Sequence, residues 1–267
     1  MLRIYYWQGL NIKNIGDELG PFIIKNFTKK KVVKTSHKDR GALFTVGSIL
    51  GMAKYAGQTV WGAGFMTSHQ NSNLKSNIFT VRGPLSRIKI KSRPLPVGDP
   101  ALLLPRVYQP QAKKKYKLGI IPHYVDRDFL NRNFIIDINS PLKIINVLTD
   151  DVINFIKEVN ECEYVISSSL HGLIVAQAYQ IPALWVEFSD KVVGSGFKFF
   201  DYFLSVGIPP YRPIRINSHE CRASYLLKIL SHRRYTLEIV NFDESGLVQT
   251  LEDSVLCAEK NQEIFKR

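Results

Sequence analysis

Residues 164–187, YVISSSLHGLIVAQAYQIPALWVE, decide the fold. The first three are apolar and partly β-branched, and three serines separate them from apolar residues spaced on one helical face. Pro182 ends that helix, because a proline restricts the residue before it to extended conformations. Residues 183–186 are apolar throughout, which is typical of a parallel strand buried on both faces. The pattern predicts a strand, a turn, a helix and a second strand, which together form a βαβ unit.

The serine turn of this unit is a candidate binding site. It puts Ser168, Ser169 and His171 at the carboxyl end of a strand and the amino end of a helix. Free N–H groups and the helix dipole favour an anion at such a place. We therefore expect an anionic ligand there.

Composition indicates a globular protein with a basic surface. The chain has 267 residues, 45% of them apolar, and a formal net charge of +13. This charge would attract phosphates, acidic glycans, nucleic acid or an anionic membrane surface. Lysine runs at residues 29–31 and 113–115 are typical of solvated loops, and contact with a membrane or polyanion is the alternative. We expect no nucleic-acid partner, because no RNP-like signature, zinc finger or helix-turn-helix surrounds these runs.

Cysteine spacing and hydropathy bear on the compartment. The three cysteines lie far apart, and their odd number argues against a disulfide framework, so we expect a reducing compartment. No apolar span reaches the length of about 20 residues that a transmembrane helix needs. We expect a cytoplasmic protein whose membrane association, if any, is peripheral at the inner face of the cell membrane.

The first part of the chain predicts strands followed by polar loops. Residues 2–7 predict a strand, residues 9–20 a loop rich in Gly and Asn, and Pro21 the start of a helix that runs to about residue 27. Asn14, Gly16 and Asp17 lie in that loop. They are suited either to contact a ligand or to form an Asx turn that caps the helix.

Three further strands are predicted at residues 42–46, 59–61 and 77–81. Arg82 and Arg87 follow the last of these strands. Their guanidinium groups are suited to bind a phosphate or carboxylate, and a surface salt bridge is the alternative. Asp99 follows and is either a helix cap or an acid that faces the same cleft. The segment contains neither a P-loop nor a complete dinucleotide fingerprint.

A polar segment at residues 106–116 predicts a linker, after which the alternation of strands and helices begins again. The predicted elements are strands at 117–122, which ends in His123, and 134–138, a helix at 150–159, the βαβ unit, an aromatic helix that starts near Lys198, and surface helices at 217–230 and 244–260. The last two helices cover a sheet or lie across the seam between domains. This order predicts an α/β fold with two Rossmann-like, doubly wound domains and a cleft between them.

The motifs together resemble the polysaccharide pyruvyl transferase family. The matching segments, in the order of the family, are residues 14–17 (NIGD), 46–48 (VGS), 61–64 (WGAG), 81–84 (VRGP), 97–100 (VGDP), and 168–172 (SSLHG) with Ile181 and Pro182. They cover most of the chain from residue 14 to about residue 202. Each motif is weak alone, and the ordered set is specific.

This resemblance implies a GT-B-like pair of domains that transfers pyruvate from phosphoenolpyruvate onto two hydroxyls of a sugar, forming a cyclic ketal. It implies an N-terminal domain at 1–110 on the acceptor side, a C-terminal domain at 111–240 on the phosphoenolpyruvate side, and a helical segment at 241–267 packed on the domains. Family members hold the donor with basic residues, including an arginine where this chain has Ser169. Arg82, Arg87 or Lys198 are candidates to replace that arginine.

Residue roles follow from the chemistry that the resemblance implies. Catalytic candidates are His171, Asp17 and Asp99, because the reaction needs an acid and a base. The expected donor-binding residues are Arg82, Arg87, Ser168, Ser169 and Lys198, and the expected acceptor-binding residues are Asn14, Gly16 and Glu187. We expect no metal and no cofactor, with phosphoenolpyruvate as co-substrate. The expected acceptor is a lipid-diphosphate-linked precursor of a bacterial exopolysaccharide, capsule or cell-wall glycan.

Two other functions are compatible with these patterns. A GT-B glycosyltransferase that uses a nucleotide sugar would have the same architecture. A non-catalytic module that binds anionic glycans or a membrane surface would also need a basic cleft.

Overall fold

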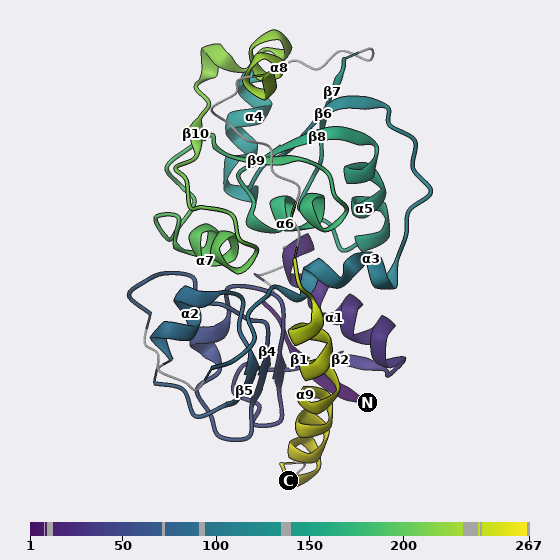
Figure 1. Ribbon diagram of the computed structural model, residues 1–267, viewed down its shortest axis with the longest axis vertical. Coiled ribbons are helices and arrows are strands. Elements are labelled where there is room, and N and C mark those ends of the chain that lie inside the picture. Colours follow the sequence, from purple (N-terminus) through teal and green to yellow (C-terminus); the bar gives the residue numbers. More distant parts are fainter. Residues whose placement is uncertain are drawn as a thin grey trace.

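The computed structural model describes residues 1–7, 9, 13–70, 73–90, 94–134, 140–231, 240 and 242–265. These residues form two five-stranded sheets in which neighbouring strands are parallel. Each sheet forms the centre of one half of the molecule, and helices cover it (Figure 1). The α/β class is therefore confirmed.

The two sheets share one topology. The first contains, in spatial order, β2 (Val32–Lys34), β1 (Leu2–Tyr5), β3 (Leu43–Phe44), β4 (Thr59–Trp61) and β5 (Asn77–Thr80). The second contains β7 (Leu142–Ile144), β6 (Tyr116–Ile121), β8 (Cys162–Ser167), β9 (Ala183–Glu187) and β10 (Ile214–Arg215). In each half the first strand lies inside the sheet, and the second strand lies beside it at one edge. The third, fourth and fifth strands follow in order on the other side of the first. This order opens a crevice at the carboxyl ends of the first and third strands of each half.

The helices surround the sheets and fill the boundary between the halves. They are α1 (Ile15–Thr28), α2 (Pro84–Lys89), α3 (Leu104–Val107), α4 (Arg127–Asn133), α5 (Val152–Asn160), α6 (Leu170–Ala178), α7 (Phe197–Ser205), α8 (Ala223–Ser231) and α9 (Ser245–Ile264). At the boundary, α6 packs against α1 and against the 3-10 turn Pro100–Leu103. One apolar cluster accordingly runs through both halves, including Leu19 and Leu103 from the first and Leu173 from the second. The halves are joined by a shared core.

Helix α9 returns from the second half to cover the first sheet (Figure 1). The indole Nε1–H of Trp61 donates to the Leu247 carbonyl at 3.1 Å, and the Gln262 amide donates to the Arg3 carbonyl at 3.1 Å. Covering a sheet was one of the two placements expected for this helix.

The predicted start of the first helix is wrong. Instead of a loop over residues 9–20 and a helix from Pro21, α1 begins at Ile15 and includes Pro21. The reason is Asn14, whose side-chain oxygen accepts the Gly16 N–H at 3.0 Å and caps the helix. The Asx-type capping expected as an alternative is therefore the observed one. Pro21 lies within the second turn, where its missing N–H costs one helical hydrogen bond.

Other elements match the predictions unevenly. The βαβ unit is confirmed as β8, α6 and β9, and the helix expected at 217–230 is divided into a 3-10 turn, Ser218–Glu220, and α8. The strand expected at 134–138 lies outside the described residues after Phe134. Three short edge strands, β2, β7 and β10, were not predicted.

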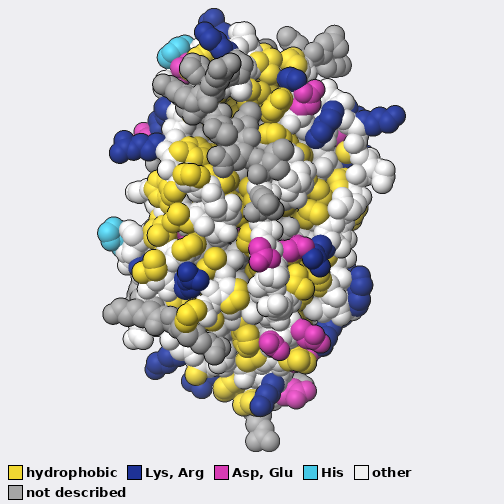
Figure 2. All heavy atoms as spheres, viewed as in Figure 1, with side chains coloured by type: hydrophobic (Ala, Val, Ile, Leu, Met, Phe, Trp, Pro, Cys, Tyr) yellow, Lys and Arg dark blue, Asp and Glu magenta, His cyan; other side chains and the backbone are white. Residues whose placement is uncertain are grey.

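Basic side chains are dispersed over the face shown in Figure 2. Several lysines of the predicted runs contact acidic or carbonyl groups: Lys30 pairs with Glu259 at 2.6 Å, and Lys115 pairs with Glu161 at 2.7 Å. Part of the positive charge in these runs is thus neutralised locally.

Candidate functional site

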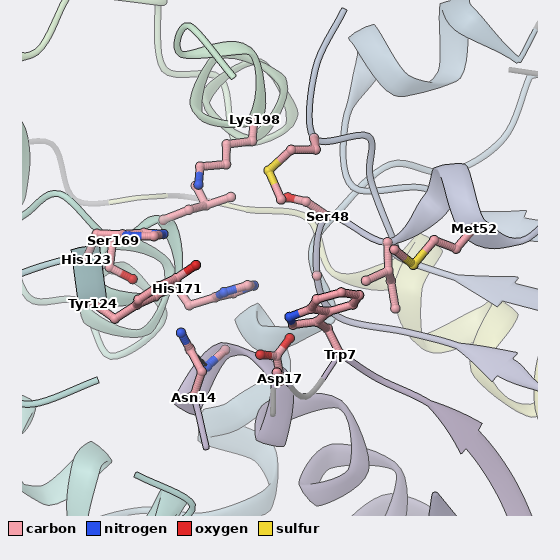
Figure 3. A pocket seen from close by; sticks show the side chains of 16 residues that line it. Trp7, Asn14, Asp17, Ser48, Met52, His123, Tyr124, Ser169, His171 and Lys198 are labelled. Carbon is pink, nitrogen blue, oxygen red and sulfur yellow. Dashed lines mark hydrogen bonds between the residues drawn. The ribbon is translucent and has the colours of Figure 1, made fainter. Parts of the chain in front are cut away.

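A cavity of about 320 Å³ lies where the crevices of the two sheets meet (Figure 3). Its wall is built from residues that follow β1, β3, β4, β6 and β8, together with Lys198 from α7. The lining residues are Trp7, Gly9, Asn14, Gly16, Asp17, Gly47, Ser48, Ile49, Met52, Met66, His123, Tyr124, Ser169, Leu170, His171 and Lys198. The strand order therefore explains why distant segments meet here.

The amino end of α6 opens into this cavity. Ser169 is its N-cap residue and makes no side-chain capping bond, while Leu170 and His171 of the first turn line the wall. The adjacent Ser168 is turned away, because its hydroxyl donates to Asp126 at 2.6 Å and accepts the His123 N–H at 2.8 Å. First-turn N–H groups and the helix dipole make this end suitable for an anion.

His171 occupies the middle of the cavity in Figure 3. It contacts α1 closely: a Cβ atom added to Gly16 would lie 2.2 Å from its Nδ1. Its Nε2 lies 4.0 Å from Asp99 Oδ2, and neither of these buried atoms has a hydrogen-bond partner among the described residues. Glycine at position 16 thus allows the imidazole to reach its place.

Burial and surrounding cations keep His171 neutral. Desolvation, followed by the positive charges of Arg82 and Lys198 and by His123, lowers the pKa of His171 to about 3. Asp99 is fully buried behind the imidazole, and its Oδ1 accepts the Ala101 N–H at 2.9 Å. Burial raises the pKa of Asp99 to about 6. At neutral pH the pair is a neutral imidazole beside a carboxylate.

Lys198 brings an ammonium group into the cavity from the first turn of α7. In Figure 3 its side chain extends down from the top of the view toward the middle of the cavity, where His171 lies. Burial, reinforced by the charge of Arg82, lowers the pKa of Lys198 to about 8. A buried ammonium group gains more free energy from pairing with an anionic ligand than an exposed lysine does, because less water screens its charge.

Arg82 lies behind the cavity in a buried network. Its guanidinium donates to Asp201 of α7, to Ser48 Oγ at 2.9 Å and to the Phe65 carbonyl at 2.6 Å. Asp201 in turn accepts from the Ser86 hydroxyl at 2.7 Å. The network fastens α7 to α2, and so it positions Lys198.

Aromatic and acidic groups form the remaining wall. Trp7 is 51% exposed and lies on the same side of the cavity as Asp17 in Figure 3, while Tyr124 is 43% exposed and lies beside His123. Burial and the neighbouring Glu18 raise the pKa of Asp17 to about 7. Burial and Lys198 lower the pKa of His123 to about 3. The cavity therefore contains the carboxyl group of Asp17, which has a raised pKa, and the ammonium group of Lys198 on another part of its wall.

The predicted site residues fall into three groups. Those that line the cavity are Asn14, Gly16, Asp17, Ser169, His171 and Lys198. Asp99, Arg82 and Ser168 are buried behind the wall. Arg87 and Glu187 do not line it: Arg87 donates to the Leu95 carbonyl, and Glu187 lies 4.0 Å from Arg215.

Sequence reasoning did not include Trp7, Ser48, His123 or Tyr124 in the site. His123 and Trp7 end predicted strands and Ser48 follows one, so position at a strand's carboxyl end was the signal that was available for them. In the part of the chain that the structure describes, no group of three His, Cys, Asp or Glu residues could hold a metal ion. No helix among the same residues is long and apolar enough to cross a membrane.

Fold and cavity define a class: an α/β protein of two parallel sheets with a partly buried, anion-suited cavity between them. The model of the polysaccharide pyruvyl transferase family matches residues 14–190, and the chain belongs to this family.

Two curated proteins and one solved structure are similar to the chain. The uncharacterized protein L143 of Acanthamoeba polyphaga mimivirus is 29% identical, covering 77% of this chain and 75% of its own. The succinoglycan biosynthesis protein ExoV of Rhizobium meliloti is 28% identical, covering 80% of this chain and 68% of its own. The crystal structure of an uncharacterized protein from Klebsiella pneumoniae aligns with a TM-score of 0.44 and 14% identity, covering 76% of this chain and 86% of that chain.

Proposed function

We propose that this protein transfers pyruvate from phosphoenolpyruvate onto two hydroxyls of a saccharide, closes a cyclic ketal and releases phosphate. Family membership supports pyruvyl transfer to a polysaccharide. The observation that carries the finer proposal is one cavity in which Lys198, His171 and the amino end of α6 meet the carboxyl group of Asp17. An anionic donor fits the first three groups, and a hydroxyl nucleophile fits the carboxylate.

The proposed architecture is a GT-B-like pair of Rossmann-like domains, residues 1–110 and 111–240, with residues 241–267 packed on the first. The shared strand order of the two sheets supports it. The donor would lie against the second domain and the acceptor against the first.

We assign the donor site to Lys198, His123, Ser169 and the N–H groups at the start of α6. Lys198 would pair with the phosphate or carboxylate of phosphoenolpyruvate and stabilise charge on the departing phosphate. Arg82 lies behind the cavity wall and adds positive charge to the donor site. The same charge lowers the pKa of both Lys198 and His171 in the free protein. These two cations stand in for the arginine that family members have at the position of Ser169.

The proposed reaction balances protons between two groups. One proton adds to C3 of phosphoenolpyruvate while the first hydroxyl oxygen bonds to C2 and its proton passes to Asp17. The bond from C2 to the phosphate oxygen then breaks. The second hydroxyl oxygen bonds to C2 and closes the ring, and its proton leaves with the phosphate. Asp17 then releases its proton to solvent, and His171 takes up a proton from solvent when the next donor binds. An acid, a base and cations suffice, so the scheme names no metal or cofactor as a participant.

His171 is the proposed proton donor to C3, with Asp99 as the residue that positions it. In the free protein His171 is neutral, partly because three positive or titratable neighbours oppose its protonation. A bound phosphate would offset those charges and raise the pKa of His171. Donor binding would thereby create the acid that the first step needs.

We further propose that the acceptor is a lipid-diphosphate-linked precursor of an exopolysaccharide, capsule or cell-wall glycan, pyruvylated at the inner face of the cell membrane. The name of the relative ExoV, a succinoglycan biosynthesis protein, supports the exopolysaccharide part. The net charge of +13 supports attraction to a diphosphate and an anionic surface.

The test is phosphate release from phosphoenolpyruvate by the wild type and by His171→Ala, with a panel of free and lipid-linked saccharides. We expect acceptor-dependent release by the wild type and a loss of roughly 10²-fold or more in the variant. Absence of release, together with thermal protection by nucleoside diphosphates and none by phosphoenolpyruvate, would contradict the proposal and indicate a glycosyltransferase.

A further inference from the structure

One of the three tryptophans differs from the others in its surroundings. Trp61 and Trp185 are 0% and 2% exposed and pack in the core, whereas Trp7 is 51% exposed and lines the cavity. Indole has a large apolar face whose burial is favourable, so a half-exposed tryptophan in a concave site has contact area to offer a ligand. The proposed transfer chemistry does not use this side chain.

The polarity of the cavity changes from one side to the other. Lys198, His123 and the start of α6 lie on the second-half side, whereas Trp7 and Asp17 lie together on the first-half side (Figure 3). Among the described lining residues, Lys198 is the only lysine or arginine. The side with Trp7 thus presents an apolar face and a carboxyl group, which suit a ligand with a C–H face and hydroxyl donors.

We infer that Trp7 is a stacking platform for an uncharged pyranose ring of the acceptor, and that Asp17 accepts a hydrogen bond from one of its reacting hydroxyls. The apolar C–H face of the ring lies on the indole, and the hydroxyls at its edge reach the carboxylate. A ring that carries its own carboxylate is disfavoured, because it would approach the charge of Asp17. This inference rests on the proposed function for the identity of the hydroxyls, but the binding of the sugar is separable from the transfer.

The kinetic test uses the full chain and the variants Trp7→Leu and Trp7→Phe. With methyl glucopyranoside as acceptor, Trp7→Leu is expected to raise the KM for the glycoside about tenfold, in the range of a lost aromatic contact. The KM for phosphoenolpyruvate should change little, and Trp7→Phe should restore part of the affinity. Tyr55→Leu is the control, since Tyr55 is a 38% exposed aromatic residue that does not line the cavity.

A binding test separates the platform from the reaction. Because Trp61 and Trp185 are buried, titration with methyl glucopyranoside should change the emission of Trp7, and Trp7→Phe should lose the change. Methyl glucuronopyranoside, which carries a carboxylate, should bind at least tenfold more weakly.

The outcomes are distinguishable. Glycoside-dependent emission that needs Trp7, without any turnover of phosphoenolpyruvate, would retain the platform and refute the proposed function. Turnover with an unchanged glycoside KM in Trp7→Leu would overturn the platform alone. The inference is equally overturned if neither glycoside alters the emission and neither is a substrate.

Discussion

At the scale of single residues, the position of His171 depends on the absence of a side chain at Gly16. We predict that Gly16→Ala lowers kcat on the order of 10²-fold, because the added methyl group would lie 2.2 Å from His171 Nδ1 and displace the imidazole. Steady-state kinetics and thermal unfolding measure the two effects separately.

The same helix offers a matched control for that substitution. In Gly20→Ala the new methyl group would lie 2.2 Å from Thr45 Oγ1, and neither residue lines the cavity. A similar loss of stability with most of the activity retained is expected. Equal losses of kcat in the two variants would contradict a specific role for the contact between Gly16 and His171.

The titrating groups of the cavity predict a narrow optimum of pH. Asp17, with a pKa raised to about 7, is a base only after it loses its proton, so kcat/KM for phosphoenolpyruvate should rise as pH increases through about 7. Lys198, with a pKa lowered to about 8, loses its charge as pH rises further, and kcat/KM should then fall. A bell-shaped profile follows.

Lys198→Arg tests the alkaline side of this profile. A guanidinium stays charged at all accessible pH values, so the fall above about 8 should disappear even if the maximal rate is lower. The exposed Lys54→Arg should keep the wild-type profile. An alkaline fall at an unchanged pH in Lys198→Arg would show that another group causes it.

At the scale of elements, the ion pair of Arg82 and Asp201 joins the segment just before α2 to α7. Both side chains are fully buried, with Arg82 Nη2 3.0 Å from Asp201 Oδ2. We predict that Arg82→Met lowers the free energy of unfolding by about 3–5 kcal/mol, since it leaves a buried carboxylate without its partner. Denaturant unfolding measures this loss.

A double-mutant cycle supplies the contrast. Arg82→Met combined with Asp201→Leu should cost less than Arg82→Met alone, because no buried charge is left unpaired. Arg87→Met, at a half-buried arginine of α2, should cost about 1 kcal/mol or less. The double variant would argue against coupling between these two side chains if its loss in free energy of unfolding equalled the sum of the losses in Arg82→Met and Asp201→Leu.

Elements with strong local signals were predictable from the sequence, and elements that depend on partners were not. Residues 164–187 contain the local signals for a strand, a turn, a helix and a second strand within one stretch. The predicted unit is confirmed. By contrast β2, β7 and β10 have two or three residues each and exist through pairing with β1, β6 and β9. The start of α1 does not follow from Pro21, because the side chain of Asn14 caps the helix ahead of the proline.

The candidate site was predictable in its chemistry but not in its assembly. Position between a strand and a helix brought His171 and Asp17 into consideration, and the start of the aromatic helix brought in Lys198. All three line one cavity. The burial of Arg82 could not be read locally, since its partner Asp201 is 119 positions away. The contact of Gly16 with His171 likewise exists only because the two halves meet.

At the scale of the whole molecule, α9 stabilises the first half after the chain has completed the second. We predict that Leu251→Ala, at a buried position of α9, lowers the free energy of unfolding by about 2–5 kcal/mol. Leu256→Ala, at a position of the same helix that is 55% exposed, should change it by about 0.5 kcal/mol or less. Equal effects in denaturant unfolding would contradict the packing of α9 on the first sheet.

The central claim joins the two halves in one reaction, in which a donor bound at α6 and Lys198 passes its pyruvyl group to a sugar held beside Asp17. Phosphoenolpyruvate labelled at its carboxylate carbon tests this most directly, by following the label into a saccharide acceptor. We predict one label in the saccharide for each phosphate released, in a product that lacks two free hydroxyls of the acceptor. Phosphate released without label in the saccharide, or no consumption of phosphoenolpyruvate with any acceptor, would contradict the claim.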